Sequence, residues 1–293
     1  MTEKLRGVDH VSGLQWYPNG QSALSGTLLE LFRGLDALFL RWAAESGATE
    51  HAFPTFIPAT ALAKLDYFRS FPHLVTFPVV LDVDDANLKR FTEREPVDAE
   101  GSVHLAGLAP IRDVLTPAAC YHVYLNVQGE SLEAARYITT RATCFRREAQ
   151  YIPLQRQWSF SMREIVCLGT ADEVKTFLNR YQERIGEFFK DIKLPVEWTH
   201  ATDPFFNPSR NPKYLSQRLD PVKTEMVFQN QLAIGSVNFH RNYFGEAFKI
   251  SRGGREAFSG CVAFGVERWV HAWLTQFGPD KQGWPSLTSS RDG

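Results

Sequence analysis

The stretch TCFRREAQYIPLQRQWSFSMREIV, residues 143–166, decides the fold because it combines strand-like alternation with many charges. Period-2 alternation predicts two strands, over residues 137–148 and 157–168, joined by the loop sequence QYIPLQ. The stretch holds four arginines and two glutamates among large apolar side chains. It is therefore too apolar for a solvated charged surface and too charged for an ordinary core strand.

The alternation sorts these charges onto two faces. One face receives a set of side chains suited to a nucleotide, namely Arg146, Glu148, Arg156, Phe160 and Glu164. Guanidinium groups bind phosphates in a bidentate manner, a flat ring stacks on a base, and a carboxylate accepts from an exocyclic amine. A surface hairpin with cross-strand ion pairs has the same pattern. Arg147 and Arg163 point to the opposite face, toward solvent or neighbouring strands.

The rest of the chain predicts an α+β domain with a mainly antiparallel sheet and helices outside it. Helices are expected over residues 22–45, about 59–71 and 170–192, the last capped by Thr170. Strands are expected over residues 51–58, 75–82, 115–129, 223–228 and 232–240, with a strand running into a helix over 258–278. Residues 203–225 are rich in proline and predict an irregular surface insertion. We find no internal repeat and expect a single domain over residues 1–293.

Composition narrows the function. The 293 residues carry 32 Lys and Arg against 33 Asp and Glu, so a broad nucleic-acid or membrane-binding surface is not indicated. No apolar run approaches the ~18 residues of a membrane span, and the start MTEKLRGVDH lacks the apolar core of a signal peptide. We therefore expect a cytoplasmic protein. Its four cysteines form no CxxC pair, which argues against a disulfide framework.

The order F-Arg146-x-Glu148, loop, Arg156-x-x-x-Phe160 resembles motif 2 of the class II aminoacyl-tRNA synthetases, especially the seryl enzymes. GCVAFGVERW, residues 260–269, resembles motif 3, and HAFPTFIP, with Pro54, resembles a loose motif 1. The three motifs follow in the family's order over roughly residues 24–278. The resemblance implies an α+β, class II synthetase-like fold, an antiparallel sheet flanked by helices, and a homodimer formed through the motif 1 region.

The resemblance also implies roles for the matched residues. It predicts that Arg146 binds the α-phosphate and the acyl phosphate, that Glu148 contacts the adenine amine, and that Phe160 stacks on adenine. Arg156 and Arg268 are expected to hold the distal phosphates, with Mg²⁺ accompanying ATP. Attack of a carboxylate on the α-phosphorus would give an aminoacyl adenylate, a step that depends on positioning and charge neutralisation. Arg146 and Arg268 are thus the expected catalytic residues.

In the zinc-dependent branch of this family, the resemblance places a metal at the amino-acid end of the pocket. Cys120, Glu164 and Cys261 match its ligands, and they would hold Zn²⁺ with one position open for a substrate amine. Cys144 and Cys167 are expected to be buried core residues. The resemblance further suggests that the amino-acid pocket is lined by three polar residues, Glu225, Ser236 and Asn238.

Two kinds of protein share this pattern, the atypical archaeal seryl-tRNA synthetases and the amino acid:[carrier protein] ligases. Motif 1 begins near residue 51, which leaves no room before it for a tRNA-binding domain, and GSVNFHRNYFGEAF is similar to the ligases. The resemblance therefore implies ATP, a small amino acid and a phosphopantetheine-bearing carrier protein as partners, without tRNA. A tRNA-acylating enzyme and a catalytically silent paralogue remain as alternatives.

The insertion over residues 203–222 is the candidate docking element for the carrier. Its cations could meet an acidic carrier surface, although an ordinary solvated loop would carry similar charges. The cations in question are Arg210, Lys213, Arg218 and Lys223. The sequence favours glycine or alanine as the substrate through the resemblance alone, and serine stays open.

Overall fold

The computed structural model describes residues 11–287 except residues 94 and 211, so both ends of the expected domain lie outside the described part. At its centre is a seven-stranded sheet in the order β3-β7-β8-β14-β11-β10-β9. Its strands are β3 (Thr49–His51), β7 (Arg136–Phe145), β8 (Ser159–Gly169), β9 (Val196–His200), β10 (Lys223–Phe228), β11 (Leu232–Arg241) and β14 (Phe258–Gly265). Only the edge strand β3 pairs in parallel, with β7. The expected α+β class, with a mainly antiparallel sheet, is confirmed.

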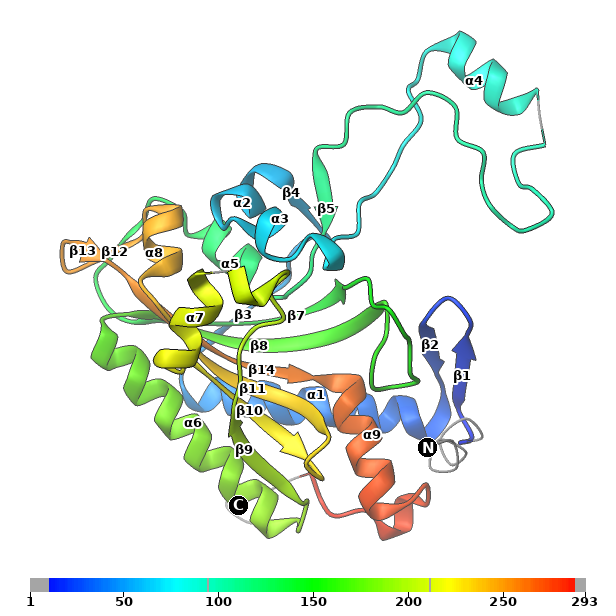
Figure 1. Ribbon diagram of the computed structural model, residues 1–293. Coiled ribbons are helices and arrows are strands. Elements are labelled where there is room, and N and C mark those ends of the chain that lie inside the picture. Colours follow the sequence, from blue (N-terminus) through cyan, green and yellow to red (C-terminus); the bar gives the residue numbers. More distant parts are fainter. Residues whose placement is uncertain (1–10, 94, 211, 288–293) are drawn as a thin grey trace.

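Three long helices cover one face of the sheet (Figure 1). They are α1 (Gly26–Glu45), α6 (Ala171–Asp191) and α9 (Val266–Phe277). Apolar residues at three- and four-residue steps give each helix one buried stripe, and Phe39 of α1 stacks on Phe264 of β14 at 4.1 Å. The α6 helix starts at a capping box in which Thr170 and Glu173 bond each other's backbone N–H, as the expected cap requires.

Shorter elements gather at the opposite face of the sheet (Figure 1). They are β4 (Phe56–Pro58), α2 (Ala59–Lys64), α3 (Tyr67–Ser70), the 3₁₀ turn η2 (Pro72–Leu74), β5 (Asp113–Leu115), α5 (Tyr121–Asn126), α7 (Pro212–Leu219) and α8 (Tyr243–Phe248). A second core of buried side chains lies between them and the sheet. Because short segments cover this face unevenly, it is the face that can hold a cavity.

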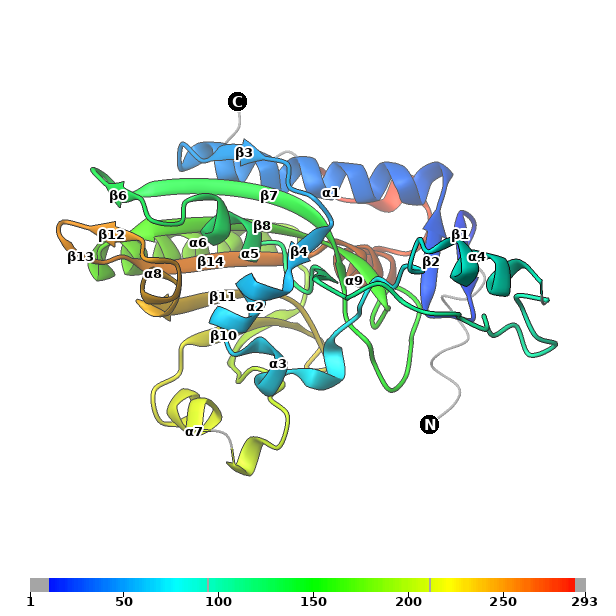
Figure 2. The same cartoon turned by 90° about the horizontal axis from the view of Figure 1, so that it is seen from above.

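The remaining elements lie at the periphery. They are the hairpin β1 (Leu14–Tyr17) and β2 (Gln21–Leu24), the small strands β6 (Ser131–Leu132), β12 (Ser251–Arg252) and β13 (Arg255–Glu256), helix α4 (Asp85–Thr92), and the turns η3 (Pro208–Arg210) and η4 (Lys281–Gly283). Residues 75–112, which we call the arm, project from the body and carry α4 (Figures 1 and 2). Within the described residues, no helix combines the length and apolar character that a membrane crossing requires.

Several expected elements differ from the structure. Residues 115–129 are not one strand, because only 113–115 are extended and Tyr121–Asn126 form α5. Here three consecutive buried side chains, His122 to Tyr124, override strand propensity by packing under β4 and α8. Residues 75–82 form no sheet strand, the helix over 59–71 breaks at Asp66 (φ 52°), and the insertion contains α7.

Arg163 also differs from its expected setting. It points to the face opposite the nucleotide-type residues, but it is only 2% exposed. Its guanidinium pairs with Asp36 of α1 at 2.5 Å and with Glu50 of β3 at 2.9 Å. The partners are separated from it by more than one hundred positions, so nothing local announces them. A buried arginine needs such carboxylates, since an unpaired buried charge is strongly destabilising.

Candidate active site

A cavity of about 530 Å³ opens on the sheet face that the short helices cover, and every residue predicted for the site lines it. The β7–β8 hairpin, strands β10, β11 and β14, and the start of α9 contribute these residues, together with the turn before α5. The set is Cys120, Arg146, Glu148, Arg156, Phe160, Glu164, Glu225, Ser236, Asn238, Cys261 and Arg268. The structure thus brings the whole predicted set together, while the role of each residue stays a prediction.

Arg146 is fixed at the end of β7. Its Nε donates to the carbonyl oxygen of Pro117 at 2.9 Å, and its Nη2 lies 3.7 Å from the sulfur of Met162. The guanidinium also sits over the ring of Phe160, with 5.3 Å to the ring centroid. Backbone and ring contacts orient the group without neutralising it, so its charge remains available to an anion.

The other two arginines add to this positive region. Arg156 pairs with Glu148 at 3.5 Å and keeps half of its side chain exposed. Arg268 donates to the carbonyl oxygens of Gln155 at 2.7 Å and Ala233 at 2.9 Å. Burial, and then repulsion from Arg146 and Arg156, lowers the pKa of Arg268 to about 10. Mutual repulsion of this kind marks a place where a polyanion would be stabilised.

Cys120, Glu164 and Cys261 form a buried group of metal-type ligands. One atom of each, the two Sγ atoms and a carboxylate oxygen, lies within 4.8 Å of the others. The Glu164 carboxylate accepts the backbone N–H groups of Ala119 at 3.0 Å and Cys120 at 3.2 Å, which ties it to the turn before α5. Two thiolates and a carboxylate are a donor set that suits Zn²⁺ with an open fourth position, so the residues fit the ion.

The two other cysteines do not join this group. Cys144 and Cys167 are buried on β7 and β8, and Cys167 packs in the core beneath the long helices. Burial raises the pKa of the Cys167 thiol to about 12 and that of the Cys144 thiol further. Both therefore stay protonated, as expected of core residues.

Ser236 and Asn238 follow each other on the cavity side of β11. The Asn238 Nδ2 donates to the Ser236 hydroxyl at 3.0 Å and to the Cys261 sulfur at 3.3 Å. The pairing of β11 with β14 places Asn238 directly opposite Cys261, which explains this contact. The amide of Asn238 therefore links the expected amino-acid pocket to the metal-type ligands.

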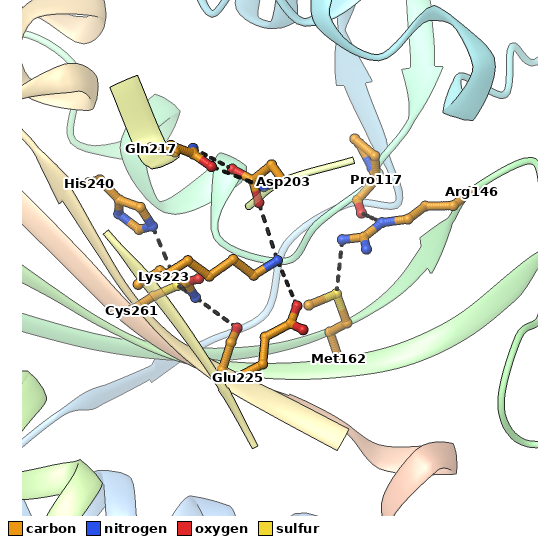
Figure 3. Close-up of polar contacts among 11 residues, drawn as sticks. Pro117, Arg146, Met162, Asp203, Gln217, Lys223, Glu225, His240 and Cys261 are labelled. Atoms are coloured by element: carbon orange, nitrogen blue, oxygen red, sulfur yellow. Dashed lines mark hydrogen bonds and ion pairs between the residues drawn. The ribbon is translucent and has the colours of Figure 1, made fainter. Parts of the chain in front are cut away.

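Lys223, expected on the docking surface, instead lies inside the cavity (Figure 3). Its ammonium pairs with Asp203 at 3.2 Å and with Glu225 at 3.0 Å. Gln217 of α7 brackets Asp203 by donating to its carboxylate and accepting its backbone N–H, each at 2.9 Å. Although burial alone would raise the pKa of Asp203, Lys223 and Gln217 bring it below the usual value. The correction arises because strand β10 starts at Lys223 and turns its side chain inward.

The remaining cations of the insertion keep a surface position in part. Arg210 ends η3 and is exposed, and Arg218 is exposed on α7 with its guanidinium over the ring of Tyr214. The side chain of Lys213 lies outside the described part of the structure. Two of the four predicted docking cations are thus shown to face outward.

Sequence reasoning missed four polar residues of the cavity. They are Asp203, Gln217, His240 and Glu267. Both carboxylate oxygens of Glu267 accept the Ser161 N–H at 2.9 Å, and burial raises the pKa of this carboxyl to about 7. His240 lies in GSVNFHRNYFGEAF, which pointed to a family without assigning the residue. Asp203 and Gln217 gave no signal, because their partners are fixed only when the insertion folds back.

Comparison with protein families supports the motif assignment. The model for the tRNA synthetase class II core domain (G, H, P, S and T) matches residues 114–277. Two amino acid–[acyl-carrier-protein] ligases of Bradyrhizobium diazoefficiens are each 34% identical to the chain, over 83% and 80% of its length. The alignments cover 76% and 71% of those relatives.

More distant relatives are whole synthetases. A type-2 serine–tRNA ligase of Methanococcus aeolicus is 27% identical over the whole chain, which spans 58% of that enzyme. The M. kandleri SerRS, solved in complex with A. aeolicus tRNASec, has the same fold with a TM-score of 0.78 at 20% identity over 94% of this chain. A prolyl-tRNA synthetase of Giardia lamblia, solved with prolyl-adenylate, matches with a TM-score of 0.66 at 15% identity. The chain spans 57% and 50% of these two structures.

Proposed function

This chain belongs to the amino acid–[acyl-carrier-protein] ligases, within the class II tRNA synthetase core family, and we propose that it loads a small amino acid onto a carrier protein. In this proposal, ATP and the amino acid form an aminoacyl adenylate, which the phosphopantetheine thiol of the carrier then attacks. The observation that carries it is the meeting of three arginines and a Cys-Glu-Cys group in one cavity.

The activation step uses the arginine end of the cavity. Arg146 neutralises the α-phosphate as the amino-acid carboxylate attacks phosphorus, and pyrophosphate leaves. Arg156 and Arg268 hold the distal phosphates, which Mg²⁺ accompanies, while Phe160 stacks on adenine and Glu148 accepts from its amine. The three guanidinium groups repel one another in the empty cavity, so binding of the triphosphate relieves that repulsion.

The amino acid occupies the other end of the cavity. Cys120, Glu164 and Cys261 hold Zn²⁺, which supplies a Lewis-acid position that binds the substrate amine. Glu225, Ser236 and Asn238 line the surrounding wall and orient the substrate. Lys223 holds Glu225 at 3.0 Å, so this carboxylate enters the pocket already paired. A small side chain fits the proposal because these groups, rather than open space, surround the amine.

The transfer step needs no protein nucleophile, since the adenylate is already reactive. The carrier docks on the insertion of residues 203–222, where Arg210 and Arg218 are exposed. Asp203 connects this insertion to Lys223 in the cavity. Docking and the cavity are therefore linked through a direct ion pair.

A homodimer is part of the proposal. Phe56, in the motif 1 region, is 50% exposed, and the neighbouring arm presents further apolar side chains to solvent. The most exposed of these on the arm are Val80, Val83 and Val103. A second copy packed on this region would remove them from water. The cytoplasmic location expected from the sequence stays a prediction.

The experiment is amino-acid-dependent exchange of pyrophosphate with ATP, run across all amino acids on samples of known zinc content. Aminoacyl transfer is then measured with holo-carrier protein and with total tRNA as acceptors. We expect exchange with glycine or alanine and loading of the carrier alone. Charging of tRNA alone would favour the second candidate, a synthetase of the type-2 seryl kind, to which the whole chain is similar. Absence of exchange would indicate a silent paralogue that binds amino acid.

A further inference from the structure

His240 stands between helix α5 and the metal-type ligands. Its Nε2 lies 3.6 Å from the sulfur of Cys261 on β14, and its Nδ1 lies 3.1 Å from the Tyr124 hydroxyl and 3.3 Å from the Ser259 hydroxyl. Figure 3 shows the imidazole directed at Cys261. The ring therefore forms a polar chain from Tyr124 to the sulfur.

Aromatic packing holds this chain in place. The ring of Tyr124 stacks on Phe244 at 3.8 Å, and His240 meets the same Phe244 edge-on at 4.9 Å. Phe244 thus serves as a common support for the tyrosine and the histidine. The imidazole has one orientation in which both nitrogen atoms find partners, and its neighbours leave little room for another.

The surroundings also decide which nitrogen carries the proton. Burial lowers the pKa of His240 to about 4, so the ring is neutral near pH 7 and has a single N–H. The hydroxyls of Tyr124 and Ser259 both face Nδ1 and can donate to it. A metal-bound cysteine is a thiolate and has no proton to donate, so the N–H belongs on Nε2, facing Cys261.

We propose that His240 is a positioning residue of the metal site, which as its Nε2–H tautomer donates a hydrogen bond to the Cys261 thiolate. Asn238 donates to the same sulfur at 3.3 Å, so this thiolate receives two hydrogen bonds. Donors of this kind withdraw charge from the sulfur and fix its direction, and they leave the bound ion more attractive to an amine. The inference rests on the proposed metal site and goes beyond it by assigning His240, Tyr124 and Ser259.

Zinc affinity tests the proposal without recourse to catalysis. Purified wild type, His240→Ala, His240→Gln and Tyr124→Phe are titrated with zinc against a chromophoric chelator. We expect His240→Ala to weaken zinc binding about 10- to 100-fold, the usual effect of losing an outer-shell partner. His240→Gln, whose amide N–H can reach the sulfur, should recover most of that loss, and Tyr124→Phe should lie in between. His271→Ala is the control, since His271 is also largely buried but lies on α9, away from the cysteines.

A spectroscopic readout separates a bond to sulfur from a general packing effect. In the cobalt-loaded protein, loss of a hydrogen bond to the thiolate should move the sulfur-to-cobalt charge-transfer band to lower energy in His240→Ala, but not in His271→Ala. Nitrogen-15 NMR of the zinc-loaded wild type should place the histidine proton on Nε2. Should His240→Ala fail to fold, His240→Gln, Tyr124→Phe and the NMR measurement still decide.

Specific results would overturn the assignment. One is a folded His240→Ala whose zinc affinity stays within threefold of wild type, and another is a proton on Nδ1 in the zinc-loaded protein. A wild-type protein that takes up neither zinc nor cobalt would instead overturn the metal site itself. Amino-acid activation by a protein that binds zinc normally, with His240 unimportant for affinity, would leave the proposed function intact and remove only this inference.

Discussion

Glu267 accepts the backbone N–H of Ser161 with both carboxylate oxygens, at 2.9 Å each, one residue beyond the ring predicted to stack on adenine. Burial raises the pKa of this carboxyl from 4.5 to about 7 in the folded state. Below pH 4.5, folded and unfolded chains are both protonated at this group, so it costs no stability. As the pH rises from about 4.5 to 7, the unfolded chain ionises first and the folded state loses stability.

The first prediction follows for Glu267→Gln, which keeps an acceptor for Ser161 and removes the titration. Relative to wild type, the variant should gain about 3 kcal/mol in free energy of unfolding between pH 4.5 and 8, from about 1.4 kcal/mol per pKa unit. Urea unfolding at several pH values measures this difference. Glu183→Gln, an exposed position on α6, is the control and should show a constant difference. A flat difference for Glu267→Gln as well would contradict the prediction.

The second prediction concerns Arg146, whose guanidinium is directed by Pro117 and Phe160. Arg146→Lys keeps the charge but loses the planar fork, so pyrophosphate exchange should fall about 100-fold or more. Steady-state exchange rates measure this, with circular dichroism to confirm folding. Its neighbour Arg147 contacts Tyr151 and Trp158 instead, so Arg147→Lys should exchange at nearly the wild-type rate. Equal losses in the two variants would count against the role of Arg146.

The third prediction concerns the metal-type ligands. Cys120→Ser, Cys261→Ser and Glu164→Gln should each lower the zinc content of the purified protein from about one ion per chain to a small fraction, because one of three ligands is removed. Elemental analysis of the samples measures it. Cys144→Ala removes a buried thiol outside the group and should retain zinc. Zinc in all four variants would exclude this site.

The fourth prediction concerns the pairing of Lys223. Replacing Lys223 by Met leaves Asp203 and Glu225 without their cation and should cost about 2 kcal/mol of unfolding free energy. In the Lys223→Met background, Asp203→Asn should cost less than it does alone, because its partner is already gone. Chemical denaturation of the four proteins of this cycle gives the coupling.

A surface pair provides the comparison for that cycle. Lys281 and Glu30 approach to 2.7 Å, but both side chains are more than half exposed. Lys281→Met should have no measurable effect on unfolding, since water screens the pair. If the cycle at Lys223 also shows no coupling, the ion pair contributes nothing to holding the insertion.

The β7–β8 hairpin was predictable from the sequence because its alternation is long and its strands pair with each other. The observed strands, Arg136–Phe145 and Ser159–Gly169, lie within three residues of the expected bounds. The helix Tyr121–Asn126 was not predictable in this way, because six residues are too few to separate a period of 3.6 from one of 2. The edge strand β9 (Val196–His200) was missed for the same reason.

The convergence of the site followed from motif order, whereas its supporting contacts did not. A motif names residues that meet the substrate, so Arg146 and Arg268 were assigned from it and do line one cavity. Asp203 reaches Lys223 only after twenty residues have folded back, and such contacts leave no local pattern. The outward expectation for Lys223 failed on this point.

Arg163 and Glu164 are neighbours in the chain and belong to opposite layers of the protein. Arg163 pairs with Asp36 and Glu50 beneath the long helices, and Glu164 faces Cys120 and Cys261 in the cavity. If β8 slipped by a single residue, a guanidinium would enter the metal site and a carboxylate would meet two others. The same pair of charges that serves the site therefore also proofreads the alignment of its strand, so misregistered folding intermediates are rejected electrostatically at the centre of the sheet.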